Sequence, residues 1–201
     1  MLAGVVLAGG KSTRMGQDKS QLTLTDNKTN LLTLSQNLLA NLAGENVWVS
    51  GEKHHNGLPD EFADCGPLSG IYSALAYFKQ EQPSIDEVIF LPVDMPFLRV
   101  GDLELLWERG RRVQSLCSYQ DHIFPLYVSL SSSFSADFFK YMHQQLSKVQ
   151  VVNTAGKTSN LSIRKVLAKF DSIQIKAMDP TYLVNINTQQ EWQQHKTNIK
   201  I

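Results

Sequence analysis

A glycine pair followed by basic residues stands near the start of the chain and could bind a phosphate group. Gly9 and Gly10 allow the backbone to approach a ligand closely and to present its N–H groups to anionic oxygens. Cations follow at Lys11, Arg14 and Lys19, and they provide the positive charge that a triphosphate needs. The spacing matches neither a Walker A loop nor a GxGxxG loop, so an ordinary strand-to-helix turn with solvated basic residues is the alternative.

A single aspartate between two prolines is the second candidate for chemistry. Asp94 lies in the segment Pro92-Val93-Asp94-Met95-Pro96, directly after the predicted buried strand 87–91. A carboxylate there could hold magnesium, which uses few protein carboxylates and takes its other ligands from substrate phosphates and water. The structural alternative is an aspartate that only shapes a turn.

Two further segments carry polar groups in a suggestive arrangement. Asp64 precedes Gly66-Pro67, and this segment could form a backbone-lined wall against a base or phosphate, although Gly-Pro is also a common helix start. Asn185 and Asn187 alternate with apolar residues, so a strand would place both amides on one face. Asparagine is disfavoured in strands, and this pattern indicates either a polar pocket or an edge strand that faces water.

The elements that must position these residues alternate between apolar runs and helical stripes. Strands are predicted at 4–7, 47–49, 87–91, 115–119, 123–130 and 182–186. Helices are predicted at 31–42, 68–78, 102–112 with Asp102 as N-cap, 134–146, 160–170 and a final one capped by Thr188. This order predicts an α/β fold with an open, mostly parallel sheet and helices on both faces. Ligands bind at the carboxyl ends of such strands, where the glycine loop and Asp94 both fall.

The bulk properties favour a single soluble domain over residues 1–201. Basic and acidic residues number 19 each, so neither nucleic acid nor an anionic membrane is favoured as a partner. No apolar run approaches the ~20 residues needed to span a bilayer. The two cysteines, Cys65 and Cys117, lie in no CxxC motif, which fits unpaired thiols and a cytoplasmic location.

The motifs as a set resemble those of the MobA-like nucleotidyltransferases. Residues 7–19 are similar to that family's signature, which consists of LAGG, then RMG, then DK. Residues 66–70 resemble its GPLAG segment, residues 92–96 its P-x-D-x-P metal motif, and residues 183–188 its late N-x-N-T segment. The matches fall in the family's order and cover most of the chain.

The resemblance implies a Rossmann-like three-layer sandwich with a mostly parallel central sheet. It also implies transfer of GMP from GTP to the molybdenum–molybdopterin cofactor, with release of pyrophosphate. Lys19 and Asp94 would be catalytic, and Asp94 would bind Mg²⁺. The implied GTP-binding residues are Leu7, Ala8, Gly9, Gly10, Arg14, Lys19, Ser50, Asp64, Gly66 and Asp94. Asn185 and Asn187 would bind the pterin, and further partners would be cofactor insertion proteins and the molybdoenzymes that receive the product.

Two departures from the family pattern keep other functions open. Ser50 stands where the guanylyl-transferring members have asparagine, and Met95 stands where threonine is common and where the cytidylyl-transferring members tend toward methionine. The alternatives are transfer from CTP to molybdopterin, transfer to a sugar phosphate, and a nucleotide-binding cofactor chaperone without turnover. Lys19 and Asp94 together argue against the chaperone, because binding alone requires neither.

Overall fold

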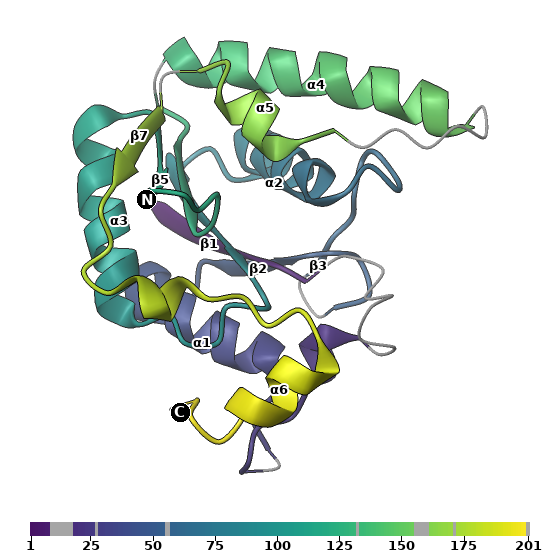
Figure 1. The fold of residues 1–201 in the computed structure, drawn as a ribbon. Coiled ribbons are helices and arrows are strands. Elements are labelled where there is room, and N and C mark those ends of the chain that lie inside the picture. The colour runs from purple at the N-terminus through teal and green to yellow at the C-terminus, as the bar shows by residue number, and fades with distance from the viewer. Residues whose placement is uncertain are drawn as a thin grey trace.

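A twisted sheet forms the centre of the molecule in the computed structural model, which describes residues 1–8, 18–26, 28–54, 57–131, 133–154, 161–170 and 172–199. Within these ranges the strand order is β3-β2-β1-β4-β6-β5-β7 (Figure 1). The strands are β1 (Leu2–Leu7), β2 (Val47–Ser50), β3 (Gly57–Leu58), β4 (Glu87–Pro92), β5 (Leu116–Tyr119), β6 (Leu126–Ser129) and β7 (Ser172–Ile175). β6 runs antiparallel to its neighbours β4 and β5, and the other pairs are parallel. The predicted mostly parallel sheet is confirmed.

Helices cover both faces of this sheet and complete three layers (Figure 1). One face carries α2 (Pro67–Glu81), α4 (Ser133–Thr154) and α5 (Ile163–Leu167), and the other carries α1 (Leu31–Ala43), α3 (Val100–Val113) and α6 (Gln189–His195). Alternation along β1 divides the core, because Ala3 and Val5 pack on the α2 side whereas Leu2 and Val6 pack on the α1 side. No helix in the described ranges is long and apolar enough to cross a membrane.

The carboxyl ends of three neighbouring strands lie level with one another. Leu7 of β1 is in register with both Ser50 of β2 and Pro92 of β4. Beyond these positions the Val93 N–H donates to the Leu7 carbonyl at 3.2 Å. The segments that follow the three strands therefore leave the sheet at the same edge, where the sequence places its two strongest motifs.

The start of α3 differs from the sequence prediction. Asp102 is not the N-cap, because the helix begins at Val100 and Arg99 takes the N-cap position with an extended backbone. The Asp102 carboxylate occupies the third helical position and accepts the Arg99 N–H at 3.1 Å. A carboxylate in the first turn of the helix thus accepts the backbone N–H of the cap residue, Arg99.

The predicted strand over 182–186 is wrong. The chain instead forms the 3-10 helix η2 (Pro180–Leu183) and continues without regular structure to Thr188. Asp179 caps η2, since its carboxylate accepts hydrogen bonds from both the N–H and the hydroxyl of Thr181. An aspartate followed by proline favours such a turn over a strand.

Two short strands and the bounds of two helices also differ from the prediction. α4 runs to Thr154, whereas the predicted helix ended at 146. β3 has two residues and β7 has four, three of which are exposed, so neither gives a strong apolar pattern. α5 covers residues 163–167 of the predicted 160–170 helix, and Asn160 lies outside the described residues.

Candidate functional site

An ion pair between Lys19 and Asp94 lies at the carboxyl edge of the sheet. Lys19 Nζ is 2.8 Å from Asp94 Oδ2, and the two side chains are only 15% and 16% exposed. Lys19 begins the 3-10 helix η1 (Lys19–Gln21), which Asp18 caps through a 2.9 Å hydrogen bond from the Ser20 N–H. Asp94 follows β4 after two residues. The sequence separates the two charges by 75 positions, and the fold brings them together.

A late segment of the chain joins both charges. The Asn185 side-chain amide donates to Asp94 Oδ1 at 2.8 Å, and Lys19 Nζ donates to Asn187 Oδ1 at 3.0 Å. The Ile186 N–H also donates to the Asp94 main-chain carbonyl at 2.8 Å. Lys19 and Asp94, predicted for the nucleotide, and the two asparagines, predicted for the pterin, therefore form one polar cluster. The two asparagines reach this cluster from irregular chain, not from the strand that the sequence suggested.

Glu191 anchors that late segment, and the sequence reasoning missed it. Its Oε2 accepts the N–H of Asn187 at 2.7 Å and of Thr188 at 3.0 Å, while Thr188 Oγ1 accepts the Glu191 N–H at 3.1 Å. The hydrogen bond from Asn187, then that from Thr188, lowers the pKa of Glu191 below its ordinary value, and the Lys19 charge acts in the same direction. The T-x-x-E spacing of a capping box was the available signal. It fixes the backbone beside Asn187.

Of the residues predicted to contact the nucleoside, Leu7 and Ser50 end strands β1 and β2, and Ala8 follows β1. Leu7 is buried and its carbonyl already accepts from Val93, and Ala8 is half-buried. Ser50 is buried, and its hydroxyl donates to Asp60 Oδ1 at 3.4 Å. Gly9, Gly10 and Arg14 lie outside the described residues.

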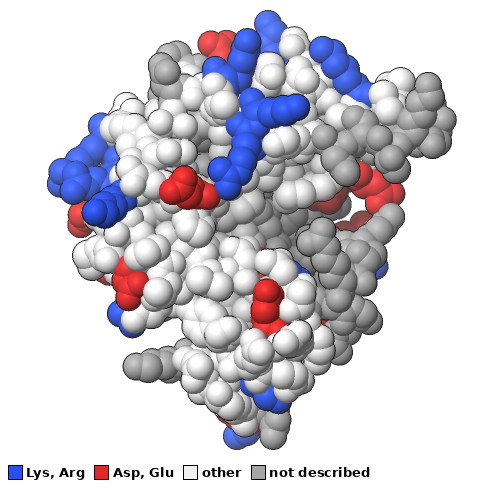
Figure 2. Space-filling view, viewed as in Figure 1, with Lys and Arg blue, Asp and Glu red and all other residues white. Residues whose placement is uncertain are grey.

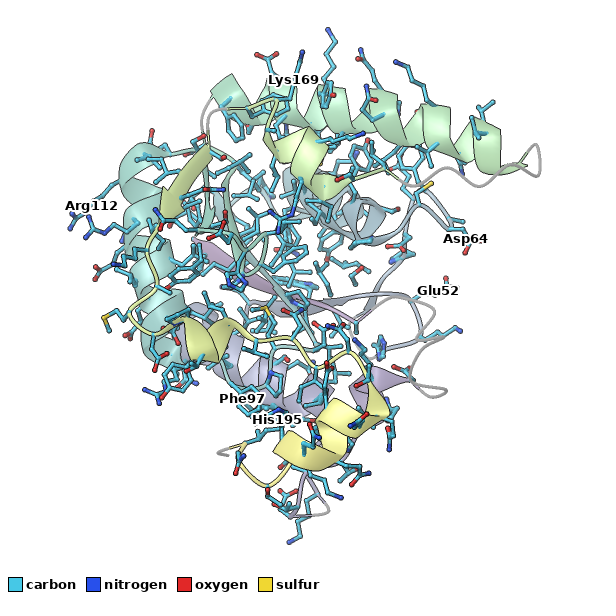
Figure 3. The ribbon with its side chains drawn as sticks, in the orientation of Figure 1. Glu52, Asp64, Phe97, Arg112, Lys169 and His195 are labelled. Carbon is cyan, nitrogen blue, oxygen red and sulfur yellow. The ribbon has the colours of Figure 1, made fainter. Side chains whose placement is uncertain are left out.

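The loop before α2 carries the other two predicted nucleotide contacts. Asp64 and Gly66 are both exposed, and both have positive φ angles, of 56° and 72°. The Gly66 carbonyl accepts the Ser69 N–H at 3.0 Å and so starts α2. Figure 3 shows Asp64 on the same side of the molecule as Glu52, which follows β2.

The donor set around Asp94 fits a divalent metal. No group of three or more histidine, cysteine, aspartate or glutamate side chains gathers anywhere in the described ranges. Asp94 offers one carboxylate, whose two oxygens accept from Lys19 Nζ and from the Asn185 side-chain amide. Magnesium is commonly held by one or two carboxylates with substrate phosphates. A site of this composition therefore suits a metal that arrives with a nucleotide, and Asp94 is the residue that would hold it.

A family model described as a MobA-like NTP transferase domain matches residues 4–154. The chain belongs to the MobA-like NTP transferase family. That matched range includes Lys19 and Asp94 of the candidate site, whereas Asn185, Asn187 and Glu191 lie beyond it.

Two relatives and one solved structure align over nearly the whole chain. The molybdenum cofactor guanylyltransferase of Xanthomonas euvesicatoria pv. vesicatoria is 31% identical over 193 residues, covering 94% of this chain and 91% of that protein. The enzyme of the same name from Campylobacter jejuni strain RM1221 is 28% identical over 206 residues, covering 98% and 96%. The crystal structure of molybdopterin-guanine dinucleotide biosynthesis protein A from Archaeoglobus fulgidus aligns with a TM-score of 0.70 at 16% identity, over 98% of this chain and 97% of that one. This last likeness shows the fold.

Proposed function

We propose that the chain transfers GMP from GTP to the molybdenum–molybdopterin cofactor, forming the guanine dinucleotide cofactor and pyrophosphate. The observation that carries the proposal is the Lys19–Asp94 pair at the carboxyl edge of the sheet, in a chain whose near full-length relatives are named molybdenum cofactor guanylyltransferases. We further propose that residues 1–201 act as one domain, because the late segment supplies both an edge strand and site side chains. We also propose a cytoplasmic location, which the free thiols of Cys65 and Cys117 support.

The reaction needs positioning and charge neutralisation more than a base. A terminal phosphate oxygen of the pterin attacks the α-phosphorus of GTP, the new P–O bond forms, and the bond from the α-phosphorus to the bridging oxygen breaks to release pyrophosphate. A phosphate monoester is already anionic, so no side chain has to remove a proton. When bound at Asp94, a divalent metal, proposed to be Mg²⁺, neutralises the phosphate charge that this displacement concentrates.

The chain's own residues hold and orient the reacting groups. Lys19 binds the triphosphate as a point charge, and its hydrogen bond to Asn187 limits where the ammonium can lie. Asn185 fixes the Asp94 carboxylate through Oδ1. Arg14 would add a second phosphate contact, and Leu7, Ala8, Gly9, Gly10, Ser50, Asp64 and Gly66 would surround the guanosine.

The contact of Asn185 and Asn187 with the catalytic charges supports their proposed role toward the acceptor. Attack requires the acceptor oxygen to approach the α-phosphorus to about 3–3.5 Å. Side chains that bind the acceptor phosphate must therefore adjoin those that bind the triphosphate. The two asparagines touch Asp94 and Lys19 directly, which is the arrangement that such a transfer needs.

Turnover with a set of nucleotides tests the proposal. The purified chain is incubated with molybdopterin cofactor, Mg²⁺ and one of GTP, CTP, ATP or UTP, and the pterin product is identified by mass spectrometry while released pyrophosphate is measured. We expect the guanylyl product and pyrophosphate in equal amounts. Comparable efficiency with CTP would overturn the guanine assignment, and nucleotide binding without pyrophosphate would instead indicate a cofactor chaperone. Delivery to insertion proteins and molybdoenzymes follows from the same proposal.

A further inference from the structure

The strand β7 leaves one edge of the sheet open. It stands last in the strand order and pairs with β5, and no other described strand pairs with it. On the paired side the Ile175 carbonyl accepts the Gln120 N–H at 2.9 Å. Backbone groups alternate in direction along a strand, so the N–H and carbonyl of Gln174 face the open side. An incoming strand could pair with them.

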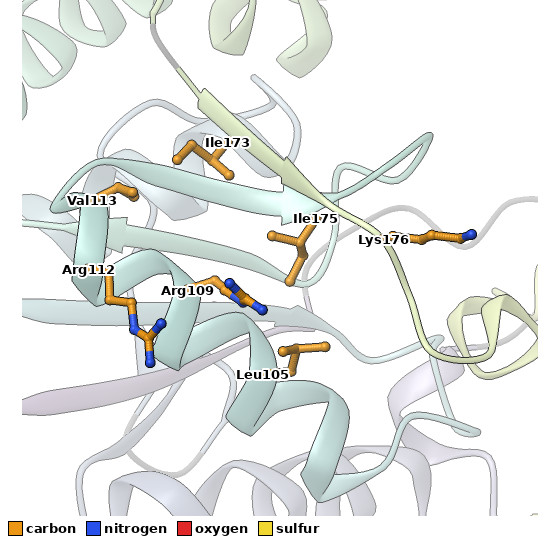
Figure 4. Close-up of a pocket in the computed structure, with 7 residues that line it drawn as sticks. All are labelled: Leu105, Arg109, Arg112, Val113, Ile173, Ile175 and Lys176. Atoms are coloured by element: carbon orange, nitrogen blue, oxygen red, sulfur yellow. The ribbon is translucent and has the colours of Figure 1, made fainter.

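A hollow of about 370 Å³ lies beside this open edge, between β7 and the last turns of α3 (Figure 4). Its apolar lining comes from Leu105 and Val113 of α3 and from Ile173 and Ile175 of β7. Val113 is 38% exposed and Ile173 39% exposed, which is high for large apolar side chains. A second hollow shares these two residues and extends the groove to Phe170. The open edge therefore has an apolar surface alongside it, on which the apolar side chains of an added strand could pack.

Three cations surround this apolar surface. Arg109, Arg112 and Lys176 line the same hollow, which no carboxylate lines. None of the three forms an ion pair within the described part of the chain. Arg111, on the same helix, does find a carboxylate, since it lies 3.9 Å from Glu87. Figure 2 shows basic side chains gathered at the edge of the molecule that α3 occupies. Figure 3, in the same orientation, labels Arg112 at that edge.

This charge is local, and among the three cations the helix dipole at the last turn of α3 favours Arg112 alone. The chain as a whole has no net charge, and like charges placed around one hollow repel each other. A lysine at an edge strand is a common protection against aggregation, and that would explain Lys176. It does not explain two arginines directed from a helix, or isoleucine and valine left exposed between them. An anionic ligand with apolar groups would satisfy both features.

We propose that this groove binds an extended, acidic segment of a partner protein, which adds a strand to β7. Its backbone would pair with Gln174, its apolar side chains would lie on Val113 and Ile173, and its carboxylates would meet Arg109 and Arg112. A second copy of this chain does not fit, because a two-fold contact would bring the same cations face to face. The proposal is independent of the transfer reaction proposed above.

Selection from a library of random twelve-residue peptides, with the full chain as target, tests this proposal. We expect the selected peptides to alternate acidic with apolar residues, and their binding to weaken as salt is raised. By calorimetry, Arg109→Glu with Arg112→Glu should weaken binding of a selected peptide at least tenfold. Arg111→Glu is the control, because it reverses a charge on the same helix outside the hollow, although one charge instead of two, and it should bind like the wild type.

A proline at position 174 separates strand addition from simple charge attraction. The Gln174 N–H faces the open side, so Gln174→Pro keeps the pairing with β5 and removes the donor that an added strand needs. We expect this variant to keep its circular dichroism spectrum and to lose peptide binding at least tenfold. Any of four results would overturn the proposal. These are selected peptides that lack acidic residues, equal peptide binding by the double glutamate variant and its control, unchanged peptide binding by Gln174→Pro, and a dimer in sedimentation that depends on the groove residues.

Discussion

Removing one charge of the Lys19–Asp94 pair should destabilise the ligand-free protein measurably. At 2.8 Å and an effective dielectric constant of about 20, the attraction is about 6 kcal/mol before desolvation is counted. Exposed pairs contribute about 0.2–1 kcal/mol, whereas breaking a buried pair costs about 3–5 kcal/mol. With side chains 15% and 16% exposed, Lys19→Met or Asp94→Asn should each lower the free energy of unfolding by about 2 kcal/mol. That corresponds to a fall of about 4–8 °C in Tm.

A double-mutant cycle isolates the interaction. Urea unfolding is followed for the wild type, the two single variants and the Lys19→Met/Asp94→Asn double variant. The double variant contains neither charge, so it should be destabilised no more than either single variant, giving a coupling energy of about 2 kcal/mol. Arg111 and Glu87 provide the control cycle, because their distance is 3.9 Å and Arg111 is 54% exposed; their coupling should stay below about 1 kcal/mol. Additivity within about 0.5 kcal/mol for Lys19 and Asp94 would refute the reasoning.

Turnover should respond differently from stability. Each single change removes a group that stabilises charge in the transfer, so kcat should fall about 100-fold or more. The double variant should lose no more stability than either single variant, yet its turnover should be as low as theirs or lower. Near-normal turnover in a folded Asp94→Asn protein would remove Asp94 from the mechanism and leave Asp18 or Asp64 as the next acid to examine.

Three further perturbations test other parts of the structure. Glu191→Ala should raise the KM for GTP several-fold in steady-state kinetics, because it releases the backbone beside Asn187, the partner of Lys19. Asp179→Ala removes the cap of η2 but leaves the Glu191 hydrogen bonds in place, so it should not, and equal effects would argue against a specific role. Gly110→Ala should destabilise the protein by about 1–3 kcal/mol in urea unfolding, because the added Cβ would lie 2.2 Å from the buried Tyr127 ring; a stabilised variant would contradict this packing. Burial raises the pKa of Cys117 from 9.0 to about 11, so the stability that its protonated thiol contributes is complete below pH 9 and is lost as pH rises through about 11. In Cys117→Ala the urea midpoint should fall less between pH 9 and pH 11 than in the wild type. An unchanged dependence of the midpoint on pH would show that the Cys117 thiol is not its cause.

The strands that build the candidate site were predictable because they are buried on both faces. β1 and β4 are nearly continuous apolar runs that end in turn residues, and such runs identify central parallel strands. Once their order was known, the positions of Lys19 and Asp94 at one edge followed from the rule for parallel sheets. The short outer strands β3 and β7 gave no comparable pattern, because edge strands need not be apolar.

The closure of the site by the late segment could not be predicted from local sequence. Asn187 and Lys19 lie 168 positions apart, and nothing in either segment specifies the other. The alternation of Asn185 with its apolar neighbours suggested a strand, yet the turn capped by Asp179 prevails at that point. The shared direction of the two amides comes from tertiary contacts with Asp94 and Lys19, and not from strand periodicity.

The late arrival of Asn185, Asn187 and Glu191 also determines when this site can exist. A ribosome delivers the chain from its N-terminus, and early segments can fold while later ones are still being made. A nascent chain that has emerged through residue 154 holds the whole range matched by the family model, together with Lys19 and Asp94, but lacks the asparagines that hold them. The polar cluster can therefore form only after synthesis has passed Glu191, so an interrupted chain should neither bind the acceptor nor release pyrophosphate.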